Sequence, residues 1–284
     1  MTEIDPIIDE GLAWVDGQVV GARAATVSVF DRGFTLGDGL FETLLVREGI
    51  PLAWTRHLDR FSTAADRLEI EIPRSPEQLR AIVDELTNVW TAAGGGDARL
   101  RITLSRGSPP TASGTEPTLV ASLTALGTIA PTATVVRVPW VLNERSATTG
   151  IKTTSYIDHG RALAAAHRAG ASEAIMANTQ GNLCEGSATN VFVVIDDTLS
   201  TPPLTAGCLP GVTRALVLAS GCGVVERDIP FDALDDVEEM FITSSIRGLQ
   251  PVTAIDGRRL SSAHGQHTTR ALLAFSDLAA DLDP

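Results

Sequence analysis

The sequence predicts an α+β fold divided into two domains. Its 284 residues are about twice the roughly 150 residues of an average domain. Hydrophobic residues make up 44% of the chain and charged residues 20%, which supplies a sizeable core and argues against intrinsic disorder. Strand and helix patterns are mixed without strict βαβ alternation, and this favours α+β over a doubly wound parallel sheet. We expect a first domain over residues 1–126, a linker over 127–134 and a second domain over 135–284.

The first domain is expected to combine strands with two helices. Asp16-Gly17 is a turn signal that predicts a hairpin over 13–20. Ser75 can cap a helix, Pro76 fits its first position and Gln78 completes a capping box, so a helix should begin there and run to residue 90. Apolar spacing predicts the other helix over 54–68. Further strands are expected over 25–30, 39–46, 99–105 and 118–126.

The second domain is expected to follow a linker marked by Gly, Pro and small residues. The chain as a whole shows no internal repeat and no low-complexity segment. The remaining patterns predict strands over 135–140, 173–177 and 190–195 and near 240–243 and 251–255, and helices over 158–169, from about 211 and from about 264.

Charge and cysteine content narrow the possible environments and partners. The 35 acidic and 22 basic residues give a net charge of −13, which makes nucleic acid and anionic membrane surfaces poor partners. No apolar run reaches the ~18 residues of a membrane span, and residues 1–9 lack the pattern of a signal peptide, so we expect a cytoplasmic protein. Three cysteines without C-x-x-C spacing predict neither a disulfide framework nor a cysteine zinc site.

Lys152 is the most informative single residue. The chain has 21 arginines and one lysine. Arginine can replace lysine wherever only a positive charge is needed, but a guanidinium cannot lose its proton and attack a carbonyl. The single tyrosine, Tyr156, lies four residues further on in a segment with apolar and β-branched neighbours. Lys152 is therefore a candidate reactive amine, although composition alone does not separate this role from chance.

Several short motifs do not indicate catalysis. His264-Gly265-Gln266-His267 has no carboxylate at ligand spacing, so no metal site is expected. Gly186-Ser187-Ala188-Thr189 lacks the second glycine of a nucleophile elbow, and Gly37-Asp38-Gly39 is not followed by the helix that a dinucleotide site needs. The remaining isolated histidines are expected to be capping or surface residues: His57, His159 and His167.

Three further segments suit an aldehyde cofactor that carries a phosphate. Glu185 precedes a predicted strand and could keep a pyridine nitrogen protonated. The segment 209–214 leads into a helix, whose first backbone N–H groups can bind phosphate. Thr243-Ser244-Ser245 closes a strand with three hydroxyls, each able to donate to a phosphate oxygen.

With these residues in view, the chain resembles the fold-type IV pyridoxal-phosphate enzymes nearly from end to end. The resemblance is strongest over 181–192 and 209–214, and it extends from Asp31-Arg32-Gly33-Phe34 to Gln250-Pro251-Val252. It implies a smaller N-terminal α/β domain and a larger C-terminal pseudo-barrel domain, with pyridoxal phosphate at their junction. The family commonly forms homodimers.

The resemblance also implies roles for particular residues. Lys152 corresponds to the catalytic lysine that forms the Schiff base with the cofactor, and Glu185 to the partner of its pyridine nitrogen. Tyr156 is similar to a tyrosine that hydrogen-bonds the phenolic oxygen. The residues implied for the phosphate are Arg60, Val212, Thr213, Ser244 and Ser245.

The reaction is less constrained than the cofactor. Arg106, in Ser105-Arg106-Gly107, resembles the arginine with which D-amino acid aminotransferases and 4-amino-4-deoxychorismate lyases bind a substrate carboxylate, and a surface ion pair is its alternative. Arg247 could bind a second carboxylate. Arg101 lies where branched-chain enzymes keep an arginine. Glu42 replaces a threonine that some lyases use, which argues modestly against a lyase.

We therefore expect an aminotransferase that moves an amino group from a D-amino acid or related amine to a 2-oxo acid. The alternative is 4-amino-4-deoxychorismate lyase, which forms 4-aminobenzoate and pyruvate. A third interpretation, a non-catalytic interaction module with this fold, is disfavoured by the single lysine.

Overall fold

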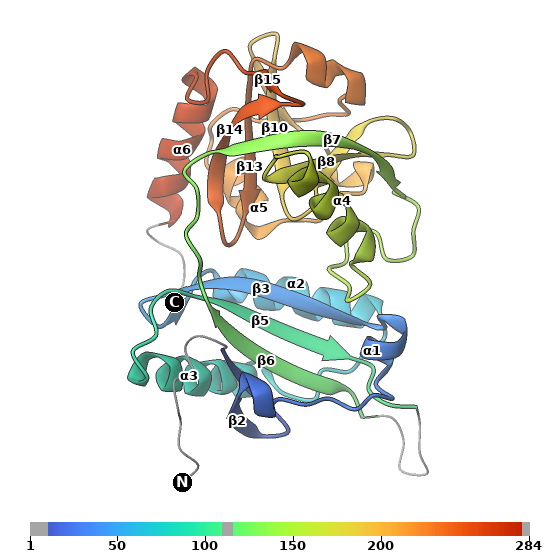
Figure 1. Cartoon of the computed structure of the whole chain (residues 1–284), viewed down its shortest axis with the longest axis vertical. Helices are drawn as coiled ribbons and strands as arrows, with labels where there is room; N and C mark the ends of the chain where they lie inside the picture. The colour runs from blue at the N-terminus through green and yellow to red at the C-terminus, as the bar shows by residue number, and fades with distance from the viewer. Residues whose placement is uncertain (1–10, 110–115, 280–284) are drawn as a thin grey trace. The chain divides into compact units, whose positions relative to one another are not determined.

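The computed structural model describes residues 11–109 and 116–279, in which the chain forms two compact units (Figure 1). The first unit comprises the chain up to Thr128 together with Lys152–Ser155. Of the described residues, the second comprises Ile129–Ile151 and those from Tyr156 onward. Lys152–Ser155 therefore belong with the first unit, whereas the predicted limits assign them to the second domain.

The first unit is a six-stranded sheet of order β2-β1-β6-β5-β3-β4. Leu40, Glu42 and Leu44 lie on one face of β3, and Phe41 lies on the other. The Glu42 side chain contacts a side chain of helix α2. This row therefore faces the helices, which pack along β3, β1 and β6. The elements are β1 (Leu12–Val15), β2 (Gln18–Gly21), α1 (Arg32–Leu36), β3 (Gly39–Arg47), β4 (Ile50–Pro51), α2 (Trp54–Arg67), α3 (Pro76–Ala92), β5 (Ala98–Ser105) and β6 (Thr118–Ala125).

Most of the predicted elements of this unit are present. The hairpin turns at Asp16 and Gly17, and the Ser75 capping box starts α3 as expected. The strand expected over 25–30 is wrong, because β2 already holds that edge of the sheet and 25–30 pairs with no strand. The short helix α1 was not expected; the Asp31 carboxylate caps its start by accepting the Gly33 N–H at 2.7 Å.

The second unit is a curled, nine-stranded sheet with three helices. Its main path runs β12-β11-β10-β13-β14-β7-β8-β9, and β15 pairs with β14. The strands are β7 (Ala133–Leu142), β8 (Glu173–Asn178), β9 (Leu183–Gly186), β10 (Asn190–Ile195), β11 (Thr198–Thr201), β12 (Val225–Glu226), β13 (Glu239–Ser244), β14 (Gly248–Ile255) and β15 (Arg258–Arg259). The helices are α4 (Ile157–Arg168), α5 (Val212–Ala219) and α6 (Gln266–Ala279).

Apolar residues lie on both faces of this sheet, which explains why its strands read as continuous apolar runs. Val191 and Val193 belong to one core cluster, whereas Phe192 and Val194 belong to another that includes Val217 of α5. The Phe192 ring stacks on Phe241 with centroids 4.7 Å apart. A third cluster holds α4 against β7 and β8.

Two details of the predicted second domain need correction. Ala133 and Thr134, expected in the linker, are already paired in β7. Glu185, expected in a loop before a strand, lies within β9, which forms an antiparallel pair with β8. The β9 strand was missed because its four residues are too short a stretch to show alternation. Among the described residues, no helix is both long and apolar enough to cross a membrane.

Candidate active site

Lys152 is held by backbone pairing with the start of β3. Its carbonyl accepts the Phe41 N–H at 2.8 Å, and the Thr154 N–H donates to the Gly39 carbonyl at 2.9 Å. Leu40 and Thr153 form the antiparallel bridge between the two segments. The β-branched Thr153 and Thr154 suit this extended conformation. The pairing gives Lys152 a fixed backbone position in the first unit.

The Lys152 side chain lies over an aromatic ring that a second cation also contacts. Its Nζ is 4.4 Å from the centroid of the Phe41 ring. The guanidinium carbon of Arg101 is 3.6 Å from the same centroid. Phe41 attracts both cations through its π-face.

On the opposite face of β3, Glu42 joins two residues of α2. It accepts from Arg60 through both oxygens, with Nε–Oε1 and Nη2–Oε2 distances of 2.7 Å. The His57 Nδ1 lies 2.8 Å from Oε2, and the Glu42 and His57 side chains are 3% and 2% exposed. Arg60, expected at the cofactor phosphate, is thus held in a fixed orientation by a buried carboxylate.

Burial and neighbouring charges have opposing effects on the pKa values of Glu42 and His57. Burial would raise the pKa of Glu42, but the charge of Arg60 and the hydrogen bonds from His57 and Arg60 outweigh it and lower that pKa to about 2. Burial lowers the pKa of His57, against the effect of Glu42. The carboxylate can only accept, so a neutral His57 carries its proton on Nδ1. His57 is therefore not the capping or surface residue that the sequence suggested.

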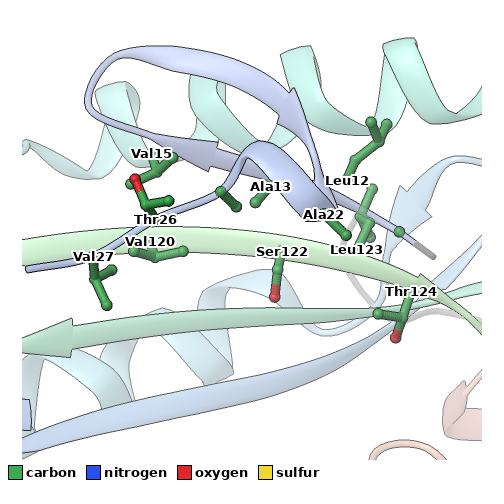
Figure 2. Close-up of a pocket in the computed structure, with 12 residues that line it drawn as sticks. Leu12, Ala13, Val15, Ala22, Thr26, Val27, Val120, Ser122, Leu123 and Thr124 are labelled. Carbon is green, nitrogen blue, oxygen red and sulfur yellow. The ribbon is translucent and has the colours of Figure 1, made fainter. Parts of the chain in front are cut away.

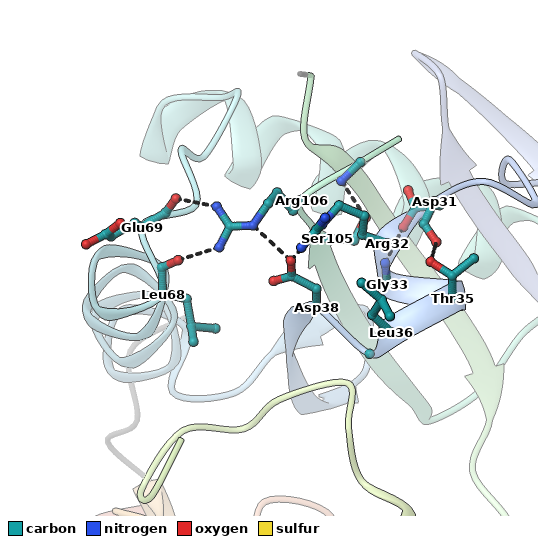
Figure 3. Close-up of polar contacts among 12 residues, drawn as sticks. Asp31, Arg32, Gly33, Thr35, Leu36, Asp38, Leu68, Glu69, Ser105 and Arg106 are labelled. Atoms are coloured by element: carbon teal, nitrogen blue, oxygen red, sulfur yellow. Dashed lines mark hydrogen bonds and ion pairs between the residues drawn. The ribbon is translucent and has the colours of Figure 1, made fainter. Parts of the chain in front are cut away.

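All three nitrogens of the Arg106 guanidinium donate hydrogen bonds to groups of the first unit (Figure 3). Its Nε donates to Asp38 Oδ2 at 2.9 Å, Nη1 to the Glu69 carbonyl at 2.9 Å and Nη2 to the Leu68 carbonyl at 2.7 Å. Arg32 donates to the same Asp38 oxygen at 2.9 Å. Burial would raise the pKa of Asp38, but the bonds from Arg106 and Arg32 lower it. These bonds tie the end of α2 to the loop after α1, and the expected role of Arg106 at a substrate carboxylate stays a prediction.

Six of the expected cofactor residues lie in the second unit, and two of them, Tyr156 and Glu185, are connected through His159. Glu185 Oε1 is 3.2 Å from His159 Nε2, and Oε2 accepts the Leu209 N–H at 2.8 Å. The Tyr156 ring stacks on the His159 ring with centroids 4.0 Å apart and planes 8° apart. His159, expected at the surface, was missed because its partners are distant in sequence or lie one helical turn away. The i, i+3 spacing from Tyr156 was the available signal.

The start of α5 provides a cradle that fits a phosphate. Gly211 is the N-cap residue, so Val212 and Thr213 lie in the first turn, where backbone N–H groups have no partner in the helix. The Asn190 side chain donates to the Leu209 carbonyl at 2.9 Å and crowds the space that a Cβ at Gly211 would need. Asn190 also pairs across the sheet with Thr243, which precedes Ser244 and Ser245.

Buried hydroxyl groups near this cradle support the same assignment. The hydroxyls of Thr189 and Thr243 are buried and lack a hydrogen-bond partner among the described residues. An unsatisfied buried hydroxyl costs free energy, so a ligand that accepts from it is favoured. Ser244 already accepts the Arg247 N–H at 3.1 Å. The residues of the second unit therefore fit an anionic cofactor.

Arg247 forms an ion pair with a buried carboxylate. Its Nη1 donates to Glu173 Oε2 at 3.1 Å, while Glu173 Oε1 accepts from the backbone and hydroxyl of Ser187. Glu173 is fully buried. An ion pair of this kind fixes Arg247, which was expected to bind a second substrate carboxylate, against β8.

One pocket of the first unit is lined by none of the expected site residues. It is a groove of about 280 Å³ beside the β1–β2 hairpin and β6 (Figure 2). Most of its lining is apolar, including Leu12, Val15 and Val120. Within residues 11–109 and 116–279, no group of three or more His, Cys, Asp or Glu side chains is placed to hold a metal ion.

Comparison with known proteins decides the family. Residues 39–255 match the family described as amino-transferase class IV. The chain belongs to this family. Class IV aminotransferases are enzymes that use pyridoxal phosphate, and this one has the same cofactor.

The relatives include more than one kind of aminotransferase. The class IV chain is 31% identical over 283 residues to a "Putative branched-chain-amino-acid aminotransferase" of Methanocaldococcus jannaschii, covering 93% of this chain and 95% of that protein. It is 30% identical to the D-alanine aminotransferase of Listeria monocytogenes, with 86% and 87% covered. The pyridoxal-phosphate-bound structure of a hypothetical aminotransferase from Mycobacterium tuberculosis has a TM-score of 0.81 at 25% identity, with 95% and 98% covered.

Proposed function

We propose that this class IV enzyme transfers an amino group from a D-amino acid or a related amine to a 2-oxo acid, with Lys152 as its catalytic residue. The observation that carries the proposal is the single lysine, held by backbone hydrogen bonds to β3 beside Phe41 and Arg101. Arginine elsewhere in the chain supplies positive charge, so the one retained amine points to chemistry that needs an amine.

Lys152 has two tasks in this proposal. Pyridoxal phosphate, when bound, supplies an aldehyde carbon and a ring that accepts electrons. Lys152 Nζ would hold the cofactor covalently through that carbon and would release it to the substrate amine. The released amine takes the proton from the substrate Cα and delivers it to the C4′ position.

The other proposed residues hold the cofactor. Arg60 and the α5 start, with Thr213, would neutralise the phosphate charge. Glu185 would accept from the protonated pyridine nitrogen, and the Tyr156 hydroxyl would donate to the phenolic oxygen. Val212, Ser244 and Ser245 would supply the remaining phosphate contacts.

The donor class rests on two lines of support. D-alanine aminotransferases are among the relatives, and Ser105-Arg106-Gly107 resembles their carboxylate-binding segment. Arg106 uses three of its five N–H groups on Asp38 and two carbonyls, so a substrate carboxylate would take the others or compete with Asp38. Arg247, which uses one N–H on Glu173, is the second candidate for this contact. We also propose that the enzyme is a homodimer.

A half-reaction tests the proposal. Cofactor-loaded enzyme is mixed with D-alanine in the absence of an acceptor, and the visible absorption band and pyruvate are followed. We expect the band to disappear as one pyruvate forms per site, whereas Lys152→Ala should keep the fold but lose turnover by at least a thousandfold. Near-normal turnover of Lys152→Ala would disprove its role.

Other substrates separate the alternatives. A band that D-alanine leaves unchanged but that L-leucine bleaches would move the donor class to branched-chain L-amino acids. Release of 4-aminobenzoate from 4-amino-4-deoxychorismate, without bleaching by either amino acid, would favour the lyase.

A further inference from the structure

His159 links the two residues of the second unit that are proposed to contact the nitrogen and the phenolic oxygen of the cofactor ring. It is the third residue of α4, which begins directly after Tyr156. Its side chain is 15% exposed. Its Nε2 is 3.2 Å from Glu185 Oε1, and its ring stacks on Tyr156 at 4.0 Å. One imidazole thus contacts both side chains.

The hydrogen bonds around Glu185 leave its carboxylate little freedom. His159 contacts one oxygen, and the Leu209 N–H holds the other at 2.8 Å. These partners come from α4 and from the loop before α5, so the carboxylate is fixed from two separate elements. A carboxylate has about four acceptor positions, and Glu185 can therefore still accept from a pyridinium N–H.

The stack fixes the imidazole in turn. The Tyr156 and His159 planes are only 8° apart, and stacked rings resist rotation about their side-chain torsions. A tilt of the His159 ring would turn Nε2 away from Glu185. The orientation of Tyr156 and that of Glu185 are therefore coupled through one side chain.

We propose that His159 is a positioning residue that aligns Glu185 by a hydrogen bond and Tyr156 by stacking. The inference rests on the proposed roles of Glu185 and Tyr156. His159 touches neither substrate nor cofactor in this proposal; it holds the proton acceptor of the pyridine nitrogen in place before the cofactor arrives.

Two substitutions separate the two contacts. His159→Phe keeps a ring for the stack but removes the donor to Glu185, whereas His159→Gln keeps an N–H donor but removes the ring. His167→Phe is the matched control, since His167 is an exposed histidine at the other end of the same helix. Thermal unfolding of each variant checks that the fold is retained.

The first measurement is cofactor binding by the apoenzyme. We expect His159→Phe to weaken pyridoxal phosphate binding about tenfold, as outer-shell partners of a site commonly do. It should not weaken binding of 1-deazapyridoxal phosphate, which has no ring nitrogen for Glu185 to hold. In a Glu185→Gln background the effect of His159→Phe should vanish.

The second measurement uses the single tyrosine. Protein labelled with 3-fluorotyrosine gives one fluorine resonance from Tyr156. His159→Gln should shift this resonance, whereas His167→Phe should leave it unchanged. This readout needs neither cofactor nor turnover.

The outcomes distinguish the two proposals. Equal losses for both cofactors, or a loss that persists with Glu185→Gln, would mean that His159 only stabilises the fold and would overturn the inference. Wild-type binding in His159→Phe would overturn it as well. Failure of the wild-type apoenzyme to prefer pyridoxal phosphate over its deaza analogue would instead disprove the role of Glu185, and the inference with it.

Discussion

Glu42 carries a buried charge that should contribute to the stability of the first unit. Its buried carboxylate has a pKa of about 2, against 4.5 in an ordinary environment. A carboxyl whose pKa is lowered on folding stabilises the protein fully above the unfolded pKa and loses this contribution as the pH falls. The loss should therefore span pH 4.5 to about 2 and amount to roughly 3 kcal/mol. The lowered pKa of His57 adds a loss that begins below pH 6.5, because the unfolded chain binds that proton first.

Glu42→Gln tests this assignment. We expect the free energy of unfolding to fall by about 3 kcal/mol at pH 7, because Arg60 loses its charged partner. The slope of stability between pH 4.5 and 2 should also become shallower. Urea unfolding across this pH range measures both effects, with Glu85→Gln on the exposed side of α3 as the control. An unchanged slope in Glu42→Gln would mean that other groups cause the acid sensitivity.

Single residues could be interpreted from the sequence where their chemistry has no substitute. Lys152 stood out because no arginine can replace a reactive amine. Arg106 has no such signature, since an arginine that binds Asp38 and two carbonyls looks the same in sequence as one that binds a substrate. The partners of His57 and His159 lie 15 and 26 residues away, at Glu42 and Glu185, so only the folded chain brings them together.

Among the elements, the pairing between β3 and Lys152–Ser155 bears most directly on the proposed chemistry. A Cβ at Gly39 would lie 2.6 Å from the Leu104 carbonyl oxygen of β5 and 3.2 Å from the Thr154 hydroxyl, so Gly39 lets both β5 and the Lys152 segment approach β3 closely. Gly39→Ala should therefore cost about 1–3 kcal/mol and push the Lys152 segment away from β3.

The single lysine makes this displacement measurable. Reductive methylation with ¹³C-formaldehyde labels Lys152 and the amino terminus, and the Lys152 resonance should shift in Gly39→Ala. Gly127→Ala is the control, because a Cβ at that position meets nothing within 4 Å. A wild-type resonance in Gly39→Ala, together with wild-type stability, would show that the pairing does not position the lysine.

Elements with strong local signals were predicted well, and those that depend on pairing were not. The helix at Pro76 follows from a capping box that acts over four residues. The segment 25–30 has strand-forming residues, yet it pairs with no strand of the sheet. β9 becomes a strand only because β8 lies beside it. Local propensity cannot supply either fact.

For the whole molecule, the fold class followed from the mixed element order, but the assignment of segments to units did not. Lys152–Ser155 lie between residues of the second unit in sequence and pack with the first. Their contacts are backbone hydrogen bonds to β3, which any sequence of suitable shape could make. The composition of Lys152–Ser155 therefore does not indicate that this segment packs with the first unit.

Exposed apolar residues around α1 are a candidate interface for the proposed homodimer. Around α1 the first unit exposes Val29, Phe30, Phe34 and Leu36, with Phe30 and Phe34 70% and 72% exposed. Large apolar side chains that are this exposed and this close together in the sequence are candidates for an interface. A second copy that buries it would bring together two chains of net charge −13, so salt should strengthen the association by screening their repulsion.

Phe30→Ser combined with Phe34→Ser should weaken the dimer at least tenfold, because two aromatic side chains lose their burial. Light scattering after size-exclusion chromatography at low and high salt measures the mass directly. Val225→Ser is the control, since Val225 is an exposed apolar residue of the second unit. A wild-type protein that stays monomeric at micromolar concentration would exclude the dimer. A double variant that stays dimeric would place the interface away from α1, and a dimer that dissociates in salt would indicate that ion pairs rather than apolar burial hold it.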